Sequence, residues 1–122
     1  MKRTDAVSGP NASAGKEARR FPRYNVNMRV AVQLHREGAL ESLWGRANEI
    51  GQDGMSATLT HELQPGEVAS LEFTLPGTMM VIRLRAAVRY RHGFRHGFEF
   101  LTLSEQHREI LCRALKMLEE QS

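Results

Sequence analysis

Three arginines stand within five residues near the start of the chain, in the segment Arg19-Arg20-Phe21-Pro22-Arg23. Arginine carries a planar fork of donors that binds a phosphate, or the O6 and N7 edge of guanine, through two hydrogen bonds, and it also stacks on bases. Three such groups around one anionic, guanine-bearing ligand would form a clamp. The alternative interpretation is a charge run at a domain edge that is merely solvated.

The positive charge of the chain is concentrated at its beginning. The net charge is +3 at pH 7, but residues 1–25 carry +4 and the remaining residues carry −1. A general nucleic-acid binder usually spreads lysine and arginine over one face of its fold, because affinity rises with each phosphate neutralised. A nearly neutral body with a local basic arm favours a small anionic ligand and argues against DNA or RNA as a partner.

Alternating apolar residues begin just after the arginines and predict the strands that must position them. Residues 1–18 are polar and nearly free of large apolar side chains, which predicts a disordered tail ahead of one domain over residues 19–122. The alternation and the turn residues between its segments indicate about six strands. They are expected at residues 26–34, 43–50, 55–60, 69–75, 80–90 and 96–101. Short antiparallel strands in this number predict a mainly β fold, a six-stranded antiparallel β-barrel.

A C-terminal α-helix is expected after the last strand, where the period of the apolar residues changes. Ser104 is a suitable N-cap, and the apolar residues that follow it fall on one face of a helix that runs to about residue 120. This helix would lie against the barrel or a partner. Within the barrel, the apolar face of the fifth strand is expected to run from Met80 to Tyr90. Trp44 and Met55 are expected in the core or at the barrel mouth.

Two further segments complete a pattern known from one protein family. Asn48-Glu49-Ile50-Gly51-Gln52-Asp53-Gly54-Met55 leads from a strand into a glycine turn, and Gly97-Phe98-Glu99-Phe100 closes the last strand. With the arginines ahead, the strands between and the helix behind, residues 19 to about 120 resemble a PilZ domain. The resemblance implies a six-stranded barrel that binds the bacterial second messenger cyclic di-GMP through an RRxxR arm and a D/NxSxxG turn.

The arm matches this family in full, and the turn matches in part. When the turn is aligned to end at Gly54, Glu49 stands where the family has Asp or Asn, and Gly51 stands where it has Ser. Glu49 keeps a carboxylate one methylene further out, whereas Gly51 supplies no hydroxyl. Losing one neutral hydrogen bond costs about 0.5–1.5 kcal/mol, so weaker binding is expected. The resemblance assigns cyclic di-GMP binding to Arg19, Arg20, Arg23, Glu49, Gly51 and Gly54.

Some residues of the turn region have a second interpretation. Gly51 and Gly54 would equally suit a tight turn with positive φ, whatever that turn bound. Asn48 could replace Glu49 as an acceptor only through a bulge, because adjacent strand residues point to opposite faces. Arg95 lies close to Gly97 in the sequence, but nothing in the sequence fixes the direction of its side chain.

The other chemistry-bearing residues argue against an enzyme, a metal site or a cofactor. Cys112 is the only cysteine, which excludes an internal disulfide, and no base stands near it. Among the scattered histidines only His92 and His96 are close together, so no set of metal ligands is expected. No apolar stretch indicates a signal peptide or a membrane span. The chain is therefore expected to be cytoplasmic and not inserted in a membrane.

Three functions remain open on these observations. The first is a non-enzymatic cyclic di-GMP receptor that signals to a downstream protein by ordering its arginine arm. The second is a degenerate PilZ-like adaptor that acts through protein contacts without the nucleotide, as Glu49 and Gly51 allow. The third is a small barrel that binds single-stranded nucleic acid, against which the near-neutral body and the shortage of exposed aromatic residues count.

Overall fold

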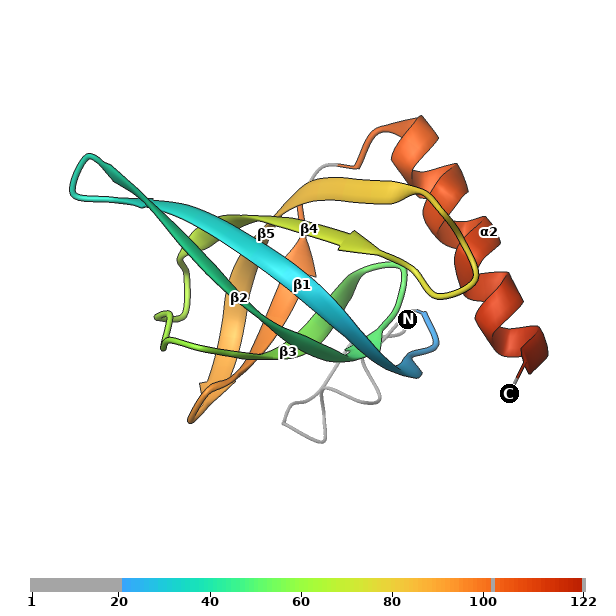
Figure 1. Ribbon diagram of the computed structural model, residues 1–122, viewed down its shortest axis with the longest axis horizontal. Coiled ribbons are helices and arrows are strands. Elements are labelled where there is room, and N and C mark those ends of the chain that lie inside the picture. Colours follow the sequence, from blue (N-terminus) through green and yellow to red (C-terminus); the bar gives the residue numbers. More distant parts are fainter. Residues whose placement is uncertain (1–20, 102, 122) are drawn as a thin grey trace, which may run out of the picture.

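The structure is a computed structural model, which describes residues 21–101 and 103–121. Six strands precede one helix, with the labels of Figure 1. They are β1 (Tyr24–Arg36), β2 (Ala39–Ile50), β3 (Gly54–Leu59), β4 (Val68–Thr74), β5 (Val81–His92), β6 (Arg95–Phe100) and α2 (Glu105–Gln121). All six predicted strands are present, with ends displaced by a few residues at most. The predicted tail, residues 1–18, lies outside the described residues.

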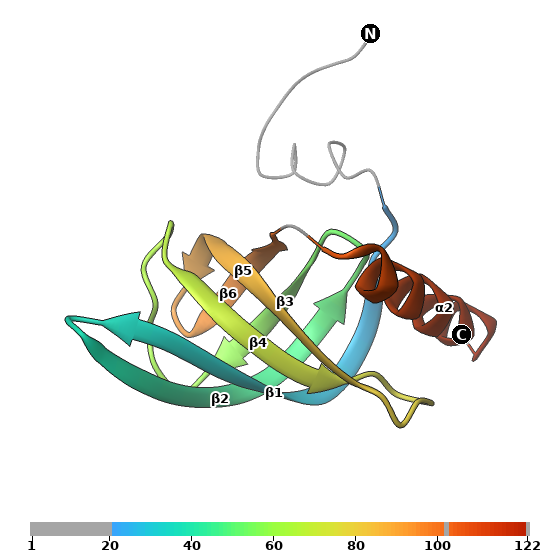
Figure 2. The same ribbon diagram turned by 90° about the horizontal axis from the view of Figure 1, so that it is seen from above.

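The strands close into a barrel in the order β1-β2-β3-β6-β5-β4, and each neighbouring pair is antiparallel. Figure 2 shows the long hairpin of β1 and β2 curving along one side of this barrel. Closure gives each described strand two hydrogen-bonded neighbours, so the fold presents no open sheet edge in this part of the chain. The predicted six-stranded barrel with a C-terminal helix is confirmed.

Strict alternation decides which side chains fill the barrel. Along β1, Met28, Val30, Val32 and Leu34 are at most 6% exposed, while the residues between them are exposed. Burying one such side chain stabilises the fold by roughly 1.5–3 kcal/mol relative to leaving it in water. The inward residues of the other strands complete a single apolar core, which contains Met55 as predicted.

Trp44 lies on the outer surface of β2, so its prediction as a core or barrel-mouth residue was wrong. The side chain is 48% exposed, because Leu43 and Gly45 on either side of it face inward. Its ring lies beneath the guanidinium of Arg29, whose Cζ is 4.6 Å from the ring centroid. The indole therefore gains a cation–π contact with a neighbouring strand instead of a place in the core.

The prediction that the apolar face of the fifth strand runs from Met80 to Tyr90 is wrong at both of these residues. Met80 precedes β5 and is exposed. Tyr90 is also exposed, because the register between β5 and β6 shifts between Val88 and Tyr90. A bulge of this kind inserts one extra residue and reverses the faces of the residues beyond it. Tyr90 thus lies on the outer surface, where it is paired with Gly97.

The helix α2 begins as predicted and covers one end of the barrel. Ser104 caps it, since its Oγ accepts a hydrogen bond from the backbone N–H of His107 at 3.1 Å. Leu111, Ala114 and Leu115 are buried against the core. Figures 1 and 2 both place the helix beside the start of β1, which is where the arginine arm enters the barrel.

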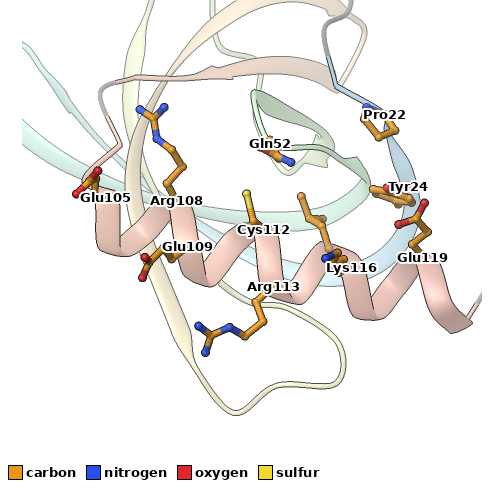
Figure 3. Close-up of a pocket in the computed structure, with 11 residues that line it drawn as sticks. Pro22, Tyr24, Gln52, Glu105, Arg108, Glu109, Cys112, Arg113, Lys116 and Glu119 are labelled. Carbon is orange, nitrogen blue, oxygen red and sulfur yellow. The ribbon is translucent and has the colours of Figure 1, made fainter.

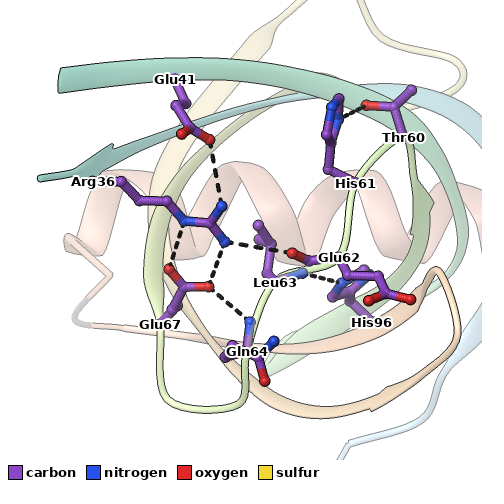
Figure 4. Close-up of polar contacts among 9 residues, drawn as sticks. All are labelled: Arg36, Glu41, Thr60, His61, Glu62, Leu63, Gln64, Glu67 and His96. Carbon is purple, nitrogen blue, oxygen red and sulfur yellow. Dashed lines mark hydrogen bonds and ion pairs between the residues drawn. The ribbon is translucent and has the colours of Figure 1, made fainter.

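A polar cluster lies at the end of the barrel where β1 finishes (Figure 4). Arg36 donates through Nε and Nη2 to the two carboxylate oxygens of Glu67, at 3.0 and 2.9 Å, and this bond lowers the pKa of the Glu67 carboxyl. Beside this pair the imidazole of His96 is fully buried. Its Nε2 accepts the backbone N–H of Leu63 at 2.9 Å, so the proton of the neutral ring is on Nδ1, which donates to the Phe94 carbonyl at 2.8 Å.

We expect acidification below pH 6.5 to destabilise the protein through His96. Burial lowers the pKa of this imidazole from its usual value of 6.5, and a protonated ring cannot accept the Leu63 N–H. The unfolded chain then binds a proton at a pH where the folded chain does not. The free energy of unfolding should fall as the pH drops below 6.5 and level off below the pKa of the folded state.

Urea unfolding at several pH values between about 7.5 and 5 measures this effect. His96→Gln removes the titrating group, so the variant should lose the dependence in this range. The matched variant His61→Gln changes an exposed histidine and should keep it. Glu67 contributes in a separate range, because its pKa is lowered and its contribution is therefore lost only below the usual value of 4.5. Equal pH dependence in His96→Gln and the unmodified protein would contradict the prediction.

Candidate ligand-binding site

The short turn between β2 and β3 is fixed by two backbone hydrogen bonds. Gly51 donates its N–H to the carbonyl of Gly54 at 2.9 Å, which closes the turn on itself. Phe100, at the end of β6, donates to the carbonyl of Asp53 at 2.9 Å. The positions of Gly51, Gln52 and Asp53 are thus set by the barrel.

Close approach of neighbouring segments explains both glycines of this turn. Neither has a positive φ, which corrects the interpretation made from the sequence. A Cβ at Gly54 would overlap the carbonyl oxygen of Phe98 on β6. A Cβ at Gly51 would lie 2.7 Å from the carbonyl oxygen of Pro22 and 2.7 Å from Cδ of Arg23. Gly54 therefore lets two strands meet, and Gly51 lets the arm lie on the turn.

Arg23 lies against this turn and contacts two carboxylates. Its Nε is 3.3 Å from Oδ1 of Asp53, and its Nη1 is 3.9 Å from Oε1 of Glu49. The Arg23 side chain is only 15% exposed. The structure thus brings together Arg23, Glu49 and Gly51, with Gly54 at the end of the same turn. Arg19 and Arg20, the other two predicted arm residues, lie outside the described residues.

A bulge in β2 places Asn48 and Glu49 on the same side of the strand. The register with β3 shifts between Ala47 and Glu49, and both Ala47 and Ile50 lie in the core. The two residues between them are therefore both left outside it. The Oδ1 of Asn48 accepts a hydrogen bond from the hydroxyl of Thr58 at 3.2 Å. The bulge that the sequence could not show is therefore present. The side-chain oxygen of Asn48 is hydrogen-bonded to Thr58 of β3.

The aromatic ring of Tyr90, which the sequence analysis did not assign to the site, lies on the outer surface of the barrel. Its strand, β5, is connected to that of Glu49 through β6 and β3. Strand pairing places Glu49 opposite Ser56, Ser56 opposite Gly97, and Gly97 opposite Tyr90. A Cβ at Gly97 would overlap the Tyr90 ring, so the ring covers this glycine. Arg95 donates from Nη2 to the Ser56 hydroxyl at 3.4 Å, which settles the direction of its side chain. The outer surface that extends from Glu49 across β3 to β6 and β5 thus carries a guanidinium and an aromatic ring.

A groove of about 690 Å³ separates the arm and the turn from α2 (Figure 3). Pro22, Tyr24 and Gln52 line one wall, and the helix forms the other, with Cys112 pointing towards the turn. Its size is within the usual range for small-molecule sites. The helix contributes three acidic and three basic residues, Glu105, Glu109, Glu119, Arg108, Arg113 and Lys116. The formal charges of these six residues cancel, so the helix wall gives the groove no net positive charge.

Neither a metal-binding cluster nor a membrane-spanning helix is present in residues 21–101 and 103–121. Within these ranges, no group of three or more His, Cys, Asp or Glu residues is arranged to hold a metal ion. Nor does the described helix have the length and apolar character that crossing a membrane requires.

Comparison with known families shows a match over most of the chain. The family model described as the PilZ domain matches residues 17–116. No curated protein sequence matches the chain. Several solved structures share its fold.

Two of these structures come from YcgR of Escherichia coli. The PilZ domain of YcgR with c-di-GMP has a TM-score of 0.67 and 23% sequence identity, covering 85% of this chain and 93% of the other. YcgR in complex with c-di-GMP has a TM-score of 0.68 and 25% identity, covering 85% of this chain and 47% of the other. The Bacillus subtilis inhibitor of motility MotI/DgrA has a TM-score of 0.65 and 17% identity, covering 84% and 52%.

Proposed function

Because the chain belongs to the PilZ domain family, we propose that it is a non-enzymatic receptor for cyclic di-GMP. The ligand would bind on the outer surface of the barrel, between the arginine arm and the turn after β2. The observation that carries this proposal is the position of Arg23 beside Glu49 and Gly51, residues that are 26 or more positions away from it in the chain. This contact between Arg23 and the turn supports a site formed by both motif segments.

Each residue of the proposed site has a chemical role. Arg23, with Arg19 and Arg20 ahead of it, would bind the phosphates and the acceptor edge of guanine through bidentate hydrogen bonds. Glu49 would accept hydrogen bonds from the donor edge of a guanine. Gly51 would let the arm lie against the turn, and Gly54 would let β3 meet β6 beside it, so both glycines would shape the site. Two structures of one similar protein, YcgR, are described with c-di-GMP, which supports the choice of ligand.

The output of the receptor would be a change in the arm. Binding would draw the three arginines around the ligand and give the start of the domain a fixed surface, a mechanism of disorder-to-order signalling. A downstream protein would read that surface. Because Pro22 and Tyr24 also line the groove beside α2, a movement of the arm would alter the groove as well.

A second candidate function, an adaptor without nucleotide, is favoured by one observation. Gly51 offers no hydroxyl, and the space that a side chain would occupy is filled by Pro22 and Arg23. The third hypothesis, nucleic-acid binding, loses support, because outward arginines of β5 are paired with acidic residues: Arg83 with Glu72 at 2.8 Å, and Arg89 with Glu99. These pairs reduce the positive charge available to a phosphate backbone.

Isothermal titration calorimetry of the purified protein with cyclic di-GMP tests the proposal. We expect saturable heat with cyclic di-GMP, and much weaker binding of GTP, which has one guanine and a different arrangement of phosphates. No heat at high micromolar cyclic di-GMP would refute the receptor and leave the adaptor. Strong, salt-dependent binding of unrelated single-stranded oligonucleotides would instead support nucleic-acid binding.

A further inference from the structure

We propose that Asp53 competes with the ligand for Arg23. In the ligand-free protein the Asp53 carboxylate contacts the Arg23 guanidinium, and this contact weakens the affinity of the protein for the ligand. This inference rests on the proposed function, since it concerns the same site. Asp53 occupies one of the two variable positions of the ExGxxG turn, between Gly51 and Gly54. The sequence pattern therefore assigned it no role, and only the structure places it against the arm.

Asp53 is held where it can compete. Its carbonyl accepts the backbone N–H of Phe100 at 2.9 Å, so the barrel fixes its backbone. Its carboxylate Oδ1 lies 3.3 Å from Nε of Arg23. The arm approaches closely, because Gly51 has no side chain to keep Pro22 and Arg23 away. A carboxylate and a phosphate are alternative anionic partners for one guanidinium, so occupation by one excludes optimal binding by the other.

The geometry of this contact is that of an exchangeable pair. Nε of Arg23 and Oδ1 of Asp53 are both buried, yet neither makes a hydrogen bond. Arg36 and Glu67 provide a contrast within the same molecule, because two hydrogen bonds of 3.0 and 2.9 Å join their charged groups. A buried donor without a hydrogen bond is costly. Arg23 therefore gains hydrogen bonds when a phosphate replaces Asp53, whereas Arg36 has none to gain by leaving Glu67.

Competition of this kind lowers the apparent affinity without removing a ligand contact. Cyclic di-GMP binds the state in which Arg23 has left Asp53, so the measured Kd equals the intrinsic value divided by the fraction of molecules in that state. Removing the carboxylate raises this fraction and also removes a negative charge from the neighbourhood of the ligand phosphates. Both effects tighten binding.

The test is Asp53→Asn, which keeps the size of the side chain and the backbone hydrogen bond but removes the charge. Calorimetric titration with cyclic di-GMP should give a Kd roughly threefold to tenfold lower than that of the unmodified protein. Asp53→Glu, which restores a carboxylate, should bind close to the unmodified protein. Glu72→Gln is the matched control, because Glu72 is also the acidic partner of an arginine, Arg83. Glu72 lies on β4, which is separated from β2 by β1. The affinity of this variant should be unchanged.

Hydrogen–deuterium exchange of the ligand-free proteins provides a readout that needs no ligand. Peptides that cover residues 21–25 should exchange faster in Asp53→Asn than in the unmodified protein and in Glu72→Gln. Equal or weaker cyclic di-GMP binding by Asp53→Asn, in a background where the unmodified protein binds, would overturn this inference and leave the proposed function intact. Absence of binding by both proteins would refute the proposed function and the inference with it.

Discussion

Arg23→Ala should lose cyclic di-GMP binding almost completely, by about 100-fold or more in Kd. Hydrogen bonds between a guanidinium and an anion contribute roughly 1.5–3 kcal/mol each, and a bidentate contact contains two of them. Every 1.4 kcal/mol is a factor of ten in affinity. Arg23 also lies directly at the turn, with its Nη1 3.9 Å from Oε1 of Glu49. Isothermal titration calorimetry against the unmodified protein measures the loss.

Two further variants separate the local contact from the effect of charge. Arg29→Ala removes an arginine of β1, the strand that follows Arg23, whose guanidinium lies over Trp44, and it should leave the affinity nearly unchanged. Arg23→Lys keeps the charge but cannot form the bidentate contact, so its affinity should fall between those of Arg23→Ala and the unmodified protein. Unchanged binding by Arg23→Ala, in a protein that melts at the normal temperature, would show that the arm does not contact the ligand.

Gly54→Ala should destabilise the fold by about 3 kcal/mol or more, even with no ligand present. A Cβ at this position overlaps the carbonyl oxygen of Phe98, which is backbone and has no freedom to rotate away. The strands β3 and β6 must then separate where Gly54 pairs with Glu99. For a domain of this size, such a loss lowers the melting temperature by about 10 °C. Thermal unfolding followed by circular dichroism measures it.

Gly38→Ala is the matched control for this prediction. Gly38 has φ 80° in the hairpin between β1 and β2, and nothing lies within 4 Å of a Cβ placed there. Its substitution costs only the strain of positive φ, about 1–2 kcal/mol. The melting temperature of Gly38→Ala should therefore be higher than that of Gly54→Ala. The reverse order would mean that β3 and β6 tolerate a side chain at Gly54, and that the packing explanation is wrong.

Local patterns were enough to predict most of the fold. The alternation that ends at Leu34 in β1 required one buried face, and a run of such strands with short turns required a closed sheet. Ser104 was predicted as an N-cap from its place ahead of a helical apolar pattern, and its hydroxyl makes the expected bond to His107. These features depend on residues that are close together in the chain, so the spacing of the apolar side chains is enough to predict them.

The errors occurred where the period changes or where distant segments meet. Tyr90 was assigned to the core because its alternation was continued through a bulge, and an extra residue in a strand leaves no mark in the sequence of that strand. Asp53 escaped notice because its partner, Arg23, is 30 positions away and belongs to a different element. For the two motif glycines, Gly51 and Gly54, the sequence suggested a turn with positive φ or a ligand contact, and neither glycine has positive φ. Their physical reason, the approach of Phe98 and Arg23, required three-dimensional contacts.

The missing side chain at Gly51 has a consequence for the ligand concentration at which a receptor of this kind would respond. A serine, the usual residue of the family at this position, would need the space that Pro22 and Arg23 occupy here. Glycine therefore removes one hydroxyl from the ligand's surroundings, and it also leaves the space in which Pro22 and Arg23 lie against the turn. Both effects would lower the affinity for the ligand. The domain would remain ligand-free at low concentrations of the second messenger and would bind it only at higher concentrations.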